Sequence, residues 1–286
     1  MTETKISDSE TIGAAYDKQL ASWRAQYAEK LAGPYGWWSI TTLTWLEPGA
    51  NILGSAHDAR IPLAKRLPEE AVRFELVGDE VTITPLVEGV MIAGQAASGP
   101  VVTKEPIELR IDADPQPVLA KLIFRGELIG VRVYDPAAPA ARDRDTEIAW
   151  FDTDQNWKVT AEFLAPEEGE TIAVADITGQ VKDVHVAGRA RFEYDGGSYT
   201  LVATPAGVPG RLFFNFRDDT NRSQSYGGGR FLNVDGPVDG RIELDFNRAH
   251  HPPCAHSPYA TCPTPTEENR LPFELLAGER YAAGQR

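Results

Sequence analysis

The sequence predicts a mainly β protein with an N-terminal helix, a β-sandwich, and a C-terminal antiparallel β-barrel or sandwich closed by a long proline-rich loop. Three observations support this architecture. A single amphipathic stripe precedes Gly33 and Pro34. Short runs of β-branched and aromatic residues then recur between Gly, Asp and Pro residues, which is typical of strands joined by turns. A segment rich in proline, residues 250–265, follows the last of these runs.

The predicted helix lies within residues 1–34. Leu20, Trp23, Tyr27 and Leu31 recur at steps of three and four, so a helix places them on one face. Gly33 and Pro34 then end the pattern, as these residues do after a helix C-terminus. We expect the stripe to pack on a sheet, with binding of a partner as the alternative.

Residues 35–134 are predicted to form the β-sandwich. The runs 72–76 and 81–84 flank Gly78 and Asp79, a pair that favours a tight hairpin turn. Further strand-like runs follow as far as Tyr134. The segment DPAAPAARDRD, residues 135–145, then changes the composition, and its prolines block regular strand pairing. We therefore expect a linker there, followed by a C-terminal β domain over residues 146–280 and a tail over 281–286.

The C-terminal domain shows the same strand signals. Apolar and polar residues alternate from Trp157 to Phe163, which indicates a strand with one buried face. Asp195, Gly196 and Gly197 predict a hairpin turn. Residues 211–217 and 241–247 alternate as well, and the second run would place Asp245 and Asn247 on the same side of a strand.

Charge and composition exclude several classes of protein. The 286 residues include 28 Lys and Arg against 42 Asp and Glu, so the formal net charge is −14. Nucleic-acid and anionic membrane binding need clustered positive charge, and we expect neither. Two cysteines are too few for a disulfide scaffold. The N-terminus lacks the pattern of a secretory signal, so the expected location is the cytoplasm.

The first half of the chain carries one family resemblance. LEPGANILGSAHDARIPL (46–63) and FELVGDEVTI (74–83) place Gly49, Ile52 and Gly54 as a forkhead-associated (FHA) domain does. The stretch 45–134 therefore resembles an FHA β-sandwich. FHA domains bind phosphothreonine through an Arg after the second Gly and a Ser-x-x-His loop. Here Ser55 stands at the Arg position and residues 67–70 are LPEE, so the resemblance implies the fold and not phosphothreonine binding.

The second half carries longer motifs. RDDTNRSQSYGGGRFL (217–232) and ELDFNRAHHPPCAHSPYATCPTPTEENRLP (243–272) resemble domain-of-unknown-function family 1684. With residues 36–54, this resemblance extends over nearly the whole chain. The family has no established activity, so the resemblance implies no function. The histidines at 250, 251 and 256 depart from the family pattern, which has Tyr-Asn before Pro-Pro-Cys and an aromatic residue two positions after the Cys.

Candidate binding residues follow the aromatic run 211–216. Gly227, Gly228 and Gly229 allow close approach of the backbone to a ligand, and Arg230 can clamp a carboxylate or phosphate. The alternative is a bend that redirects a strand, with Arg230 paired to an Asp. Other polar residues of the same motifs complete the predicted site for a small anion: Asn247, Arg248, Asn269 and Arg270. Asn269 and Arg270 have a structural alternative, in which they tie an irregular loop to the barrel.

Candidate catalytic carboxylates are Asp218, Asp219 and Asp245, which could act as a base or hold a divalent cation. For residues 218–221 the alternative is a simple turn. The proline-rich loop holds Cys254 and Cys262, with His250 and His256 nearby, and Cys and His are zinc ligands. Buried structural thiols and a redox pair are the alternatives.

The sequence thus leads to three hypotheses of different classes. The first is a protein that binds a small anionic molecule at the polar cluster of the C-terminal domain. The second is a carboxylate- or metal-dependent hydrolase, and the third is a protein-interaction module built on the FHA-like domain. The sequence identifies no cofactor and no protein partner, and it leaves open whether the protein is an enzyme.

Overall fold

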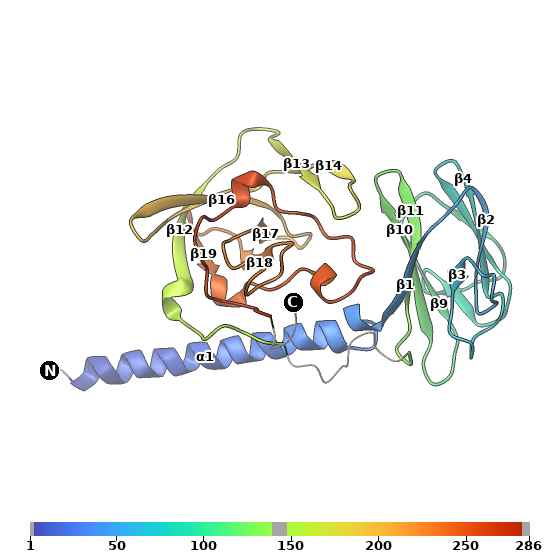
Figure 1. The fold of residues 1–286 in the computed structure, drawn as a ribbon, viewed down its shortest axis with the longest axis horizontal. Helices are drawn as coiled ribbons and strands as arrows, with labels where there is room; N and C mark the ends of the chain where they lie inside the picture. Colours follow the sequence, from blue (N-terminus) through green and yellow to red (C-terminus); the bar gives the residue numbers. More distant parts are fainter. Residues whose placement is uncertain (1–2, 139–147, 282–286) are drawn as a thin grey trace. The chain divides into compact units, whose positions relative to one another are not determined.

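The computed structural model describes residues 3–138 and 148–281, and for residues 3–12 only the backbone. Most of the predicted linker (139–145) and tail (282–286) lie outside the described residues. The chain divides into two compact units. The sandwich unit consists of residues 30–138 and 257–260, and the C-terminal unit of residues 3–29, 148–256 and 261–281. Figure 1 shows the elements along the chain.

The predicted helix is confirmed as α1 (Glu3–Ala32). Leu20 and Leu31 of the apolar stripe are buried, and Trp23 and Tyr27 are half-buried. Residues 3–29 of the helix belong to the C-terminal unit, so α1 contributes to a domain whose strands begin more than a hundred residues later.

The sandwich unit consists of two sheets that share one hydrophobic core. The six-stranded sheet has the order β1-β11-β10-β9-β6-β7, and the five-stranded sheet has the order β3-β2-β4-β5-β8. The strands are β1 (Ile40–Trp45), β2 (Gly49–Gly54), β3 (Ile61–Pro62), β4 (Val72–Val77), β5 (Glu80–Pro85), β6 (Val90–Ile92), β7 (Gln95–Ala96), β8 (Val101–Thr103), β9 (Ile107–Ile111), β10 (Val118–Arg125) and β11 (Leu128–Tyr134). Phe74 of β4 and Val131 of β11, one from each sheet, are both fully buried in this core. The predicted turn at Gly78 and Asp79 joins β4 to β5.

The C-terminal unit is built on a nearly closed, barrel-like sheet of six strands with the order β18-β17-β16-β15-β12-β19. A separate hairpin, β13-β14, lies outside this sheet. The strands are β12 (Lys158–Leu164), β13 (Thr171–Ala175), β14 (Val181–His185), β15 (Gly188–Tyr194), β16 (Gly197–Pro205), β17 (Arg211–Phe216), β18 (Arg230–Asp235) and β19 (Arg241–Asp245). Asp195 and Gly196, both with positive φ, form the predicted turn between β15 and β16.

Three short 3₁₀ helices position the polar residues of the family motifs. They are η3 (Phe246–Arg248), η4 (Pro253–Ala255) and η5 (Glu267–Asn269). The alternation predicted for residues 241–247 ends at Asp245, because its carboxylate accepts the backbone N–H of Asn247 and starts η3. Asp245 and Asn247 therefore do not share one face of a strand.

Candidate functional site

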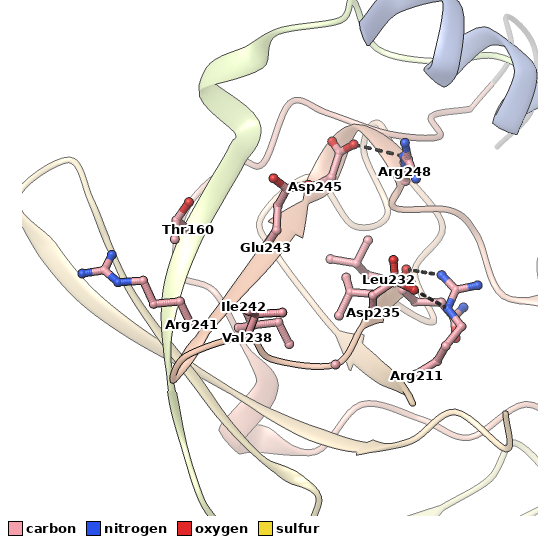
Figure 2. A pocket seen from close by; sticks show the side chains of 13 residues that line it. Thr160, Arg211, Leu232, Asp235, Val238, Arg241, Ile242, Glu243, Asp245 and Arg248 are labelled. Atoms are coloured by element: carbon pink, nitrogen blue, oxygen red, sulfur yellow. Dashed lines mark hydrogen bonds and ion pairs between the residues drawn. The ribbon is translucent and has the colours of Figure 1, made fainter. Parts of the chain in front are cut away.

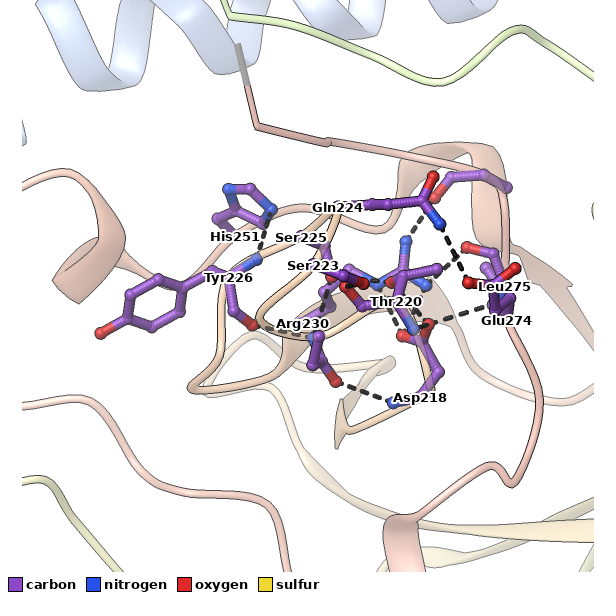
Figure 3. Close-up of polar contacts among 12 residues, drawn as sticks. Asp218, Thr220, Ser223, Gln224, Ser225, Tyr226, Arg230, His251, Glu274 and Leu275 are labelled. Carbon is purple, nitrogen blue, oxygen red and sulfur yellow. Dashed lines mark hydrogen bonds and ion pairs between the residues drawn. The ribbon is translucent and has the colours of Figure 1, made fainter. Parts of the chain in front are cut away.

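The loop from Arg217 to Gly229 joins β17 to β18 and holds five of the eleven predicted catalytic and ligand-binding residues. Figure 3 shows the polar contacts around this loop. Arg230 follows this loop and is fully buried. Its Nε and Nη2 lie 3.0 and 2.6 Å from Oδ2 of Asp218. Nη2 also donates to the carbonyl of Leu275 at 2.8 Å, and Nη1 donates to that of Ala277. The guanidinium is thus occupied inside the protein and is not presented to solvent.

Asp218 is occupied in the same way. Its Oδ1 accepts from the hydroxyl of Thr220 at 2.6 Å and from the backbone N–H groups of Thr220 and Leu275. Thr220 and Ser225 are also fully buried and share a 2.8 Å hydrogen bond. Both oxygens of this carboxylate are thus occupied by donors inside the protein, which leaves it poorly placed to contact a substrate.

The three glycines of the loop have different roles. At Gly229, φ is +100° and an added Cβ would lie 2.7 Å from the carbonyl oxygen of Phe216, so only glycine fits. At Gly228, an added Cβ would lie 2.3 Å from the ring of Tyr226. At Gly227, it would meet Cγ of Arg222 at 2.9 Å. Gly227 thus leaves room for the Arg222 side chain, whereas Gly229 is required by the backbone itself.

A polar pocket of about 300 Å³ lies beside this loop. We call it the arginine pocket, because three of its nine lining residues are arginines. The lining residues are Arg217, Asp218, Asp219, Asn221, Arg222, Gly227, Thr266, Glu267 and Arg270. Since Asp218 is paired with Arg230, the remaining charges are three guanidinium groups against the carboxylates of Asp219 and Glu267. The pocket therefore has a net positive charge in a protein whose net charge is −14.

Two hydrogen-bond donors of the arginine pocket are unused. Nε of Arg217 and Oγ1 of Thr266 are buried atoms for which the described residues supply no hydrogen-bond partner. Buried donors without a partner are uncommon and destabilising, and they often mark a missing ligand or water. The Arg270 guanidinium is exposed and lies 3.8 Å from Asp219, a distance at which an exposed pair contributes little.

Asn269 and Asn247, two further predicted ligand-binding residues, hold backbone together. Asn269 accepts from the N–H of Val202 at 2.7 Å, and its amide donates to the carbonyls of Val202 and Asn215. It thereby bridges β16 and β17 where their direct pairing stops. Asn247 exchanges hydrogen bonds of 3.1 and 2.9 Å with the backbone of Asp154. Both side chains are buried, and for Asn269 these contacts are the loop-fixing ones that were its structural alternative.

Asp245 and Arg248 lie at a second pocket, of about 350 Å³, at the seam where β18 and β19 approach each other (Figure 2). Arg248 lies 3.1 Å from Asp245, and Arg211 lies 3.4 Å from Asp235. The hydroxyl of Tyr16 on α1 also donates to Asp245, at 2.8 Å. Because these charges are balanced within the seam, it offers a weaker site for an anion than the arginine pocket does.

His251, His256 and Glu279 form a buried cluster in which the ligating atoms lie within 4.8 Å of one another. Nδ1 of His251 and Nε2 of His256 lie 3.2 and 3.1 Å from Oε1 of Glu279. Oε2 accepts from the Tyr27 hydroxyl at 2.9 Å and from the N–H of His251 at 2.7 Å. Burial would raise the pKa of Glu279, but the two histidines hold it well below its usual range.

One contact decides which ring nitrogen of His251 carries the proton. The backbone N–H of Tyr226 donates to Nε2 of His251 at 3.1 Å, so this nitrogen must carry a lone pair. A neutral His251 then has its proton on Nδ1 and donates it to Glu279. To bind a metal through Nδ1, His251 would have to direct an Nε2–H at the N–H of Tyr226. The cluster is therefore better suited to hold a buried carboxylate than a metal ion.

The weak metal candidates of the proline-rich loop fall into three places. Cys254 and Cys262 are close to each other, since the N–H of Cys254 lies 3.2 Å from Sγ of Cys262. His256 belongs to the Glu279 cluster. His250 packs against Tyr27, with ring centroids 4.8 Å apart, and burial lowers its pKa to about 4. Within residues 13–138 and 148–281, neither cysteine joins a group of three metal-ligating side chains.

Sequence reasoning missed Arg217, Arg222 and Thr266 of the arginine pocket, and Tyr27, His251 and Glu279 of the buried cluster. Arg217 and Arg222 belong to the family motif 217–232. The spacing of basic residues at 217, 222 and 230 in this motif could therefore have indicated them. Glu279 gave no such signal, because its partners lie 252 and 28 residues away in the chain.

Comparison with known proteins gives a family of unknown function. Residues 145–280 match the family described as "Protein of unknown function (DUF1684)", which covers the strands of the C-terminal unit and not residues 1–144. No curated protein matches the chain. Among solved structures, the chain is similar to an uncharacterised protein of Haloarcula marismortui determined by solution NMR. The identity is 34%, the match covers 51% of this chain and 83% of that one, and the TM-score is 0.42. No helix in the described part of the chain is long and apolar enough to cross a membrane.

Proposed function

We propose that the C-terminal unit binds a small anionic molecule in the arginine pocket. The observation that carries this proposal is that Arg217 and Thr266, which line one pocket together with two further arginines, each have a buried donor that the described residues leave unused. An anion with two acceptor oxygens, such as a carboxylate or phosphate group, would use a guanidinium in a bidentate manner and the hydroxyl as an additional donor.

The charge balance of the pocket restricts the ligand class further. Asp219 and Glu267 line the pocket as well and oppose the three arginines. A ligand with several negative charges would meet these carboxylates, whereas a monoanion, such as a single carboxylate, fits a pocket whose net charge is about +1. The volume of about 300 Å³ suits a metabolite-sized molecule at the lower end of ordinary ligand sites.

The proposal is tested by titrating the full chain with acetate and inorganic phosphate while recording amide chemical shifts. Arg217→Gln and Arg270→Gln should each weaken binding about tenfold or more, since a charged hydrogen bond contributes about 1.5–3 kcal/mol. The control is Arg211→Gln, which removes an exposed guanidinium outside the arginine pocket and should leave the affinity unchanged. Equal affinity in all three variants, or no binding of either anion at tens of millimolar, would overturn the proposal.

A second variant tests the position of Arg222. An alanine at Gly227 would place its Cβ 2.9 Å from Cγ of Arg222, and no positive φ opposes the substitution. Gly227→Ala should therefore displace the exposed Arg222 side chain and weaken anion binding, while the melting temperature changes little. A large loss of stability with unchanged affinity would show that Gly227 serves the fold alone.

For the sandwich unit, we propose an FHA-like fold without phosphothreonine binding, and we extend the family resemblance to the whole chain. The proposal is supported by close packing at Gly54, where an added Cβ would lie 1.8 Å from the carbonyl oxygen of Glu69. The hydroxyl of Ser55, which stands where FHA domains have their arginine, donates to the carbonyl of Leu67 at 2.7 Å. A phosphothreonine peptide should therefore not bind, which fluorescence anisotropy of a labelled peptide measures.

A further inference from the structure

The fold brings the two cysteines of the proline-rich loop together, although eight positions separate them in the sequence. The backbone N–H of Cys254 donates to Sγ of Cys262 at 3.2 Å, so the two residues are direct neighbours in the fold. The surroundings of the two sulfurs differ. Cys254 is half-buried in η4, directly after two prolines, whereas Cys262 is 4% exposed. Cys254 is thus the partly exposed member of the pair, and Cys262 is the buried one.

The environment of Cys254 favours its thiolate. The hydrogen bond with Cys262, followed by that with the Tyr226 hydroxyl, outweighs burial and lowers the pKa of Cys254 to about 7. Burial and the neighbouring Cys254 in turn raise the pKa of Tyr226, so this hydroxyl keeps its proton and remains a donor. A thiol with a pKa near the ambient pH combines a large thiolate fraction with good nucleophilicity.

Neither a buried structural role nor a metal role explains this arrangement. A purely structural cysteine pair is usually buried on both sides, whereas Cys254 is only half-buried. A zinc site needs at least three protein ligands. No third ligand accompanies the two cysteines among the side chains that the structure describes.

We propose that Cys254 and Cys262 form a redox-active pair that reacts with low-molecular-weight disulfides. The Cys254 thiolate attacks one sulfur of a disulfide RSSR, so the S–S bond breaks, one RS⁻ leaves and takes up a proton, and a Cys254–SR mixed disulfide forms. Cys262 then loses its proton and attacks Sγ of Cys254, which releases the second thiol as RSH. In total, RSSR is reduced to two RSH, and the two cysteines are oxidised to one disulfide.

This site is separate from the proposed anion site. Neither cysteine lines the arginine pocket, although Tyr226 precedes Gly227 of that pocket in the loop. Failure of one proposal therefore leaves the other intact. The anion titration measures affinity changes in the Arg217 and Arg270 variants, whereas the thiol-exchange experiment measures the reactions of Cys254 and Cys262.

The test uses the full chain equilibrated in mixtures of reduced and oxidised glutathione, quenched with N-ethylmaleimide and weighed intact by mass spectrometry. The wild type should convert in a single transition to a species that lacks two hydrogens and carries no maleimide. Cys262→Ser should stop at the mixed disulfide with one glutathione on Cys254. Cys254→Ser is the matched control and should accumulate no glutathione adduct under native conditions, because Cys262 is buried.

A second readout separates a reactive thiol from a buried one. The rate of alkylation of the native wild type by iodoacetamide should rise with pH around a midpoint near 7, and Tyr226→Phe should shift this midpoint upward. Three outcomes would overturn the proposal: both thiols stay unmodified until the protein unfolds, the two single-cysteine variants react alike, or native mass spectrometry shows a metal ion that is lost in both variants.

Discussion

At the scale of single residues, Arg230 shows how far burial changes the interpretation of a motif. Three glycines followed by an arginine are compatible with an anion-binding loop. The same sequence is equally compatible with an arginine that has a purely structural role. In the fold, the guanidinium and the carboxylate of Asp218 are both fully shielded from solvent. Burial lowers the pKa of Arg230, although Asp218 opposes this effect. The pair fixes the loop after β17 to the segment around Leu275.

Arg230→Met should therefore destabilise the protein strongly, by about 3–5 kcal/mol, because it leaves the Asp218 carboxylate buried without its cation. Urea unfolding monitored by circular dichroism measures this loss. Arg211→Met is the matched control: its partner Asp235 is exposed, so the free energy of unfolding should change by less than about 1 kcal/mol. An Arg230→Met protein as stable as the wild type would refute the structural role.

At the scale of elements, α1 shows what periodicity can and cannot predict. The stripe at Leu20, Trp23, Tyr27 and Leu31 correctly indicated a helix with one packed face. It did not indicate that the Tyr27 hydroxyl reaches three polar groups, since it contacts Glu279, Nε2 of His256 at 3.1 Å and the carbonyl of His251 at 3.1 Å. A tyrosine on an apolar stripe can pack its ring and direct its hydroxyl to a polar cluster.

Tyr27→Phe should keep the packing of the ring but remove a donor from the buried Glu279 carboxylate. We expect a loss of about 1–2 kcal/mol in the free energy of unfolding. Tyr35→Phe is a suitable comparison in the sandwich unit, where the hydroxyl contacts only the carbonyl of Pro117 among the described residues. Chemical denaturation of both variants checks the prediction, which fails if Tyr27→Phe costs no more than Tyr35→Phe.

At the scale of the whole molecule, local signals predicted the elements, whereas contacts between distant segments decided the site. Turn residues such as Gly78 and Asp195 act within a few positions, so the hairpins could be read from the sequence. Asp218 pairs with Arg230 and also contacts Leu275, 57 positions away. Neither hydrophobic periodicity nor composition encodes such pairings, and so the burial of Arg230 and the cluster around Glu279 could not be predicted.

The discontinuous C-terminal unit gives the last prediction. The family match begins at residue 145, but α1 supplies this unit with Leu20, which is 1% exposed, and with the Tyr16 and Tyr27 hydroxyls that bond to Asp245 and Glu279. A chain that starts at residue 145 leaves the partners of these side chains exposed or without donors. Burial of Leu20 and Tyr16 contributes about 1.5–3 kcal/mol each, and each hydrogen bond about 1 kcal/mol more. The truncated chain should therefore lose roughly 5 kcal/mol, comparable to the whole stability of many domains.

Thermal unfolding should show a melting transition far below that of the C-terminal unit in the full chain, and a synthetic peptide of residues 3–32 added in trans should raise it. Leu20→Ala in the full chain should fall between the two, with a loss of about 2–5 kcal/mol. If residues 145–286 alone melt like the full chain, α1 is an accessory to the C-terminal unit rather than part of its core.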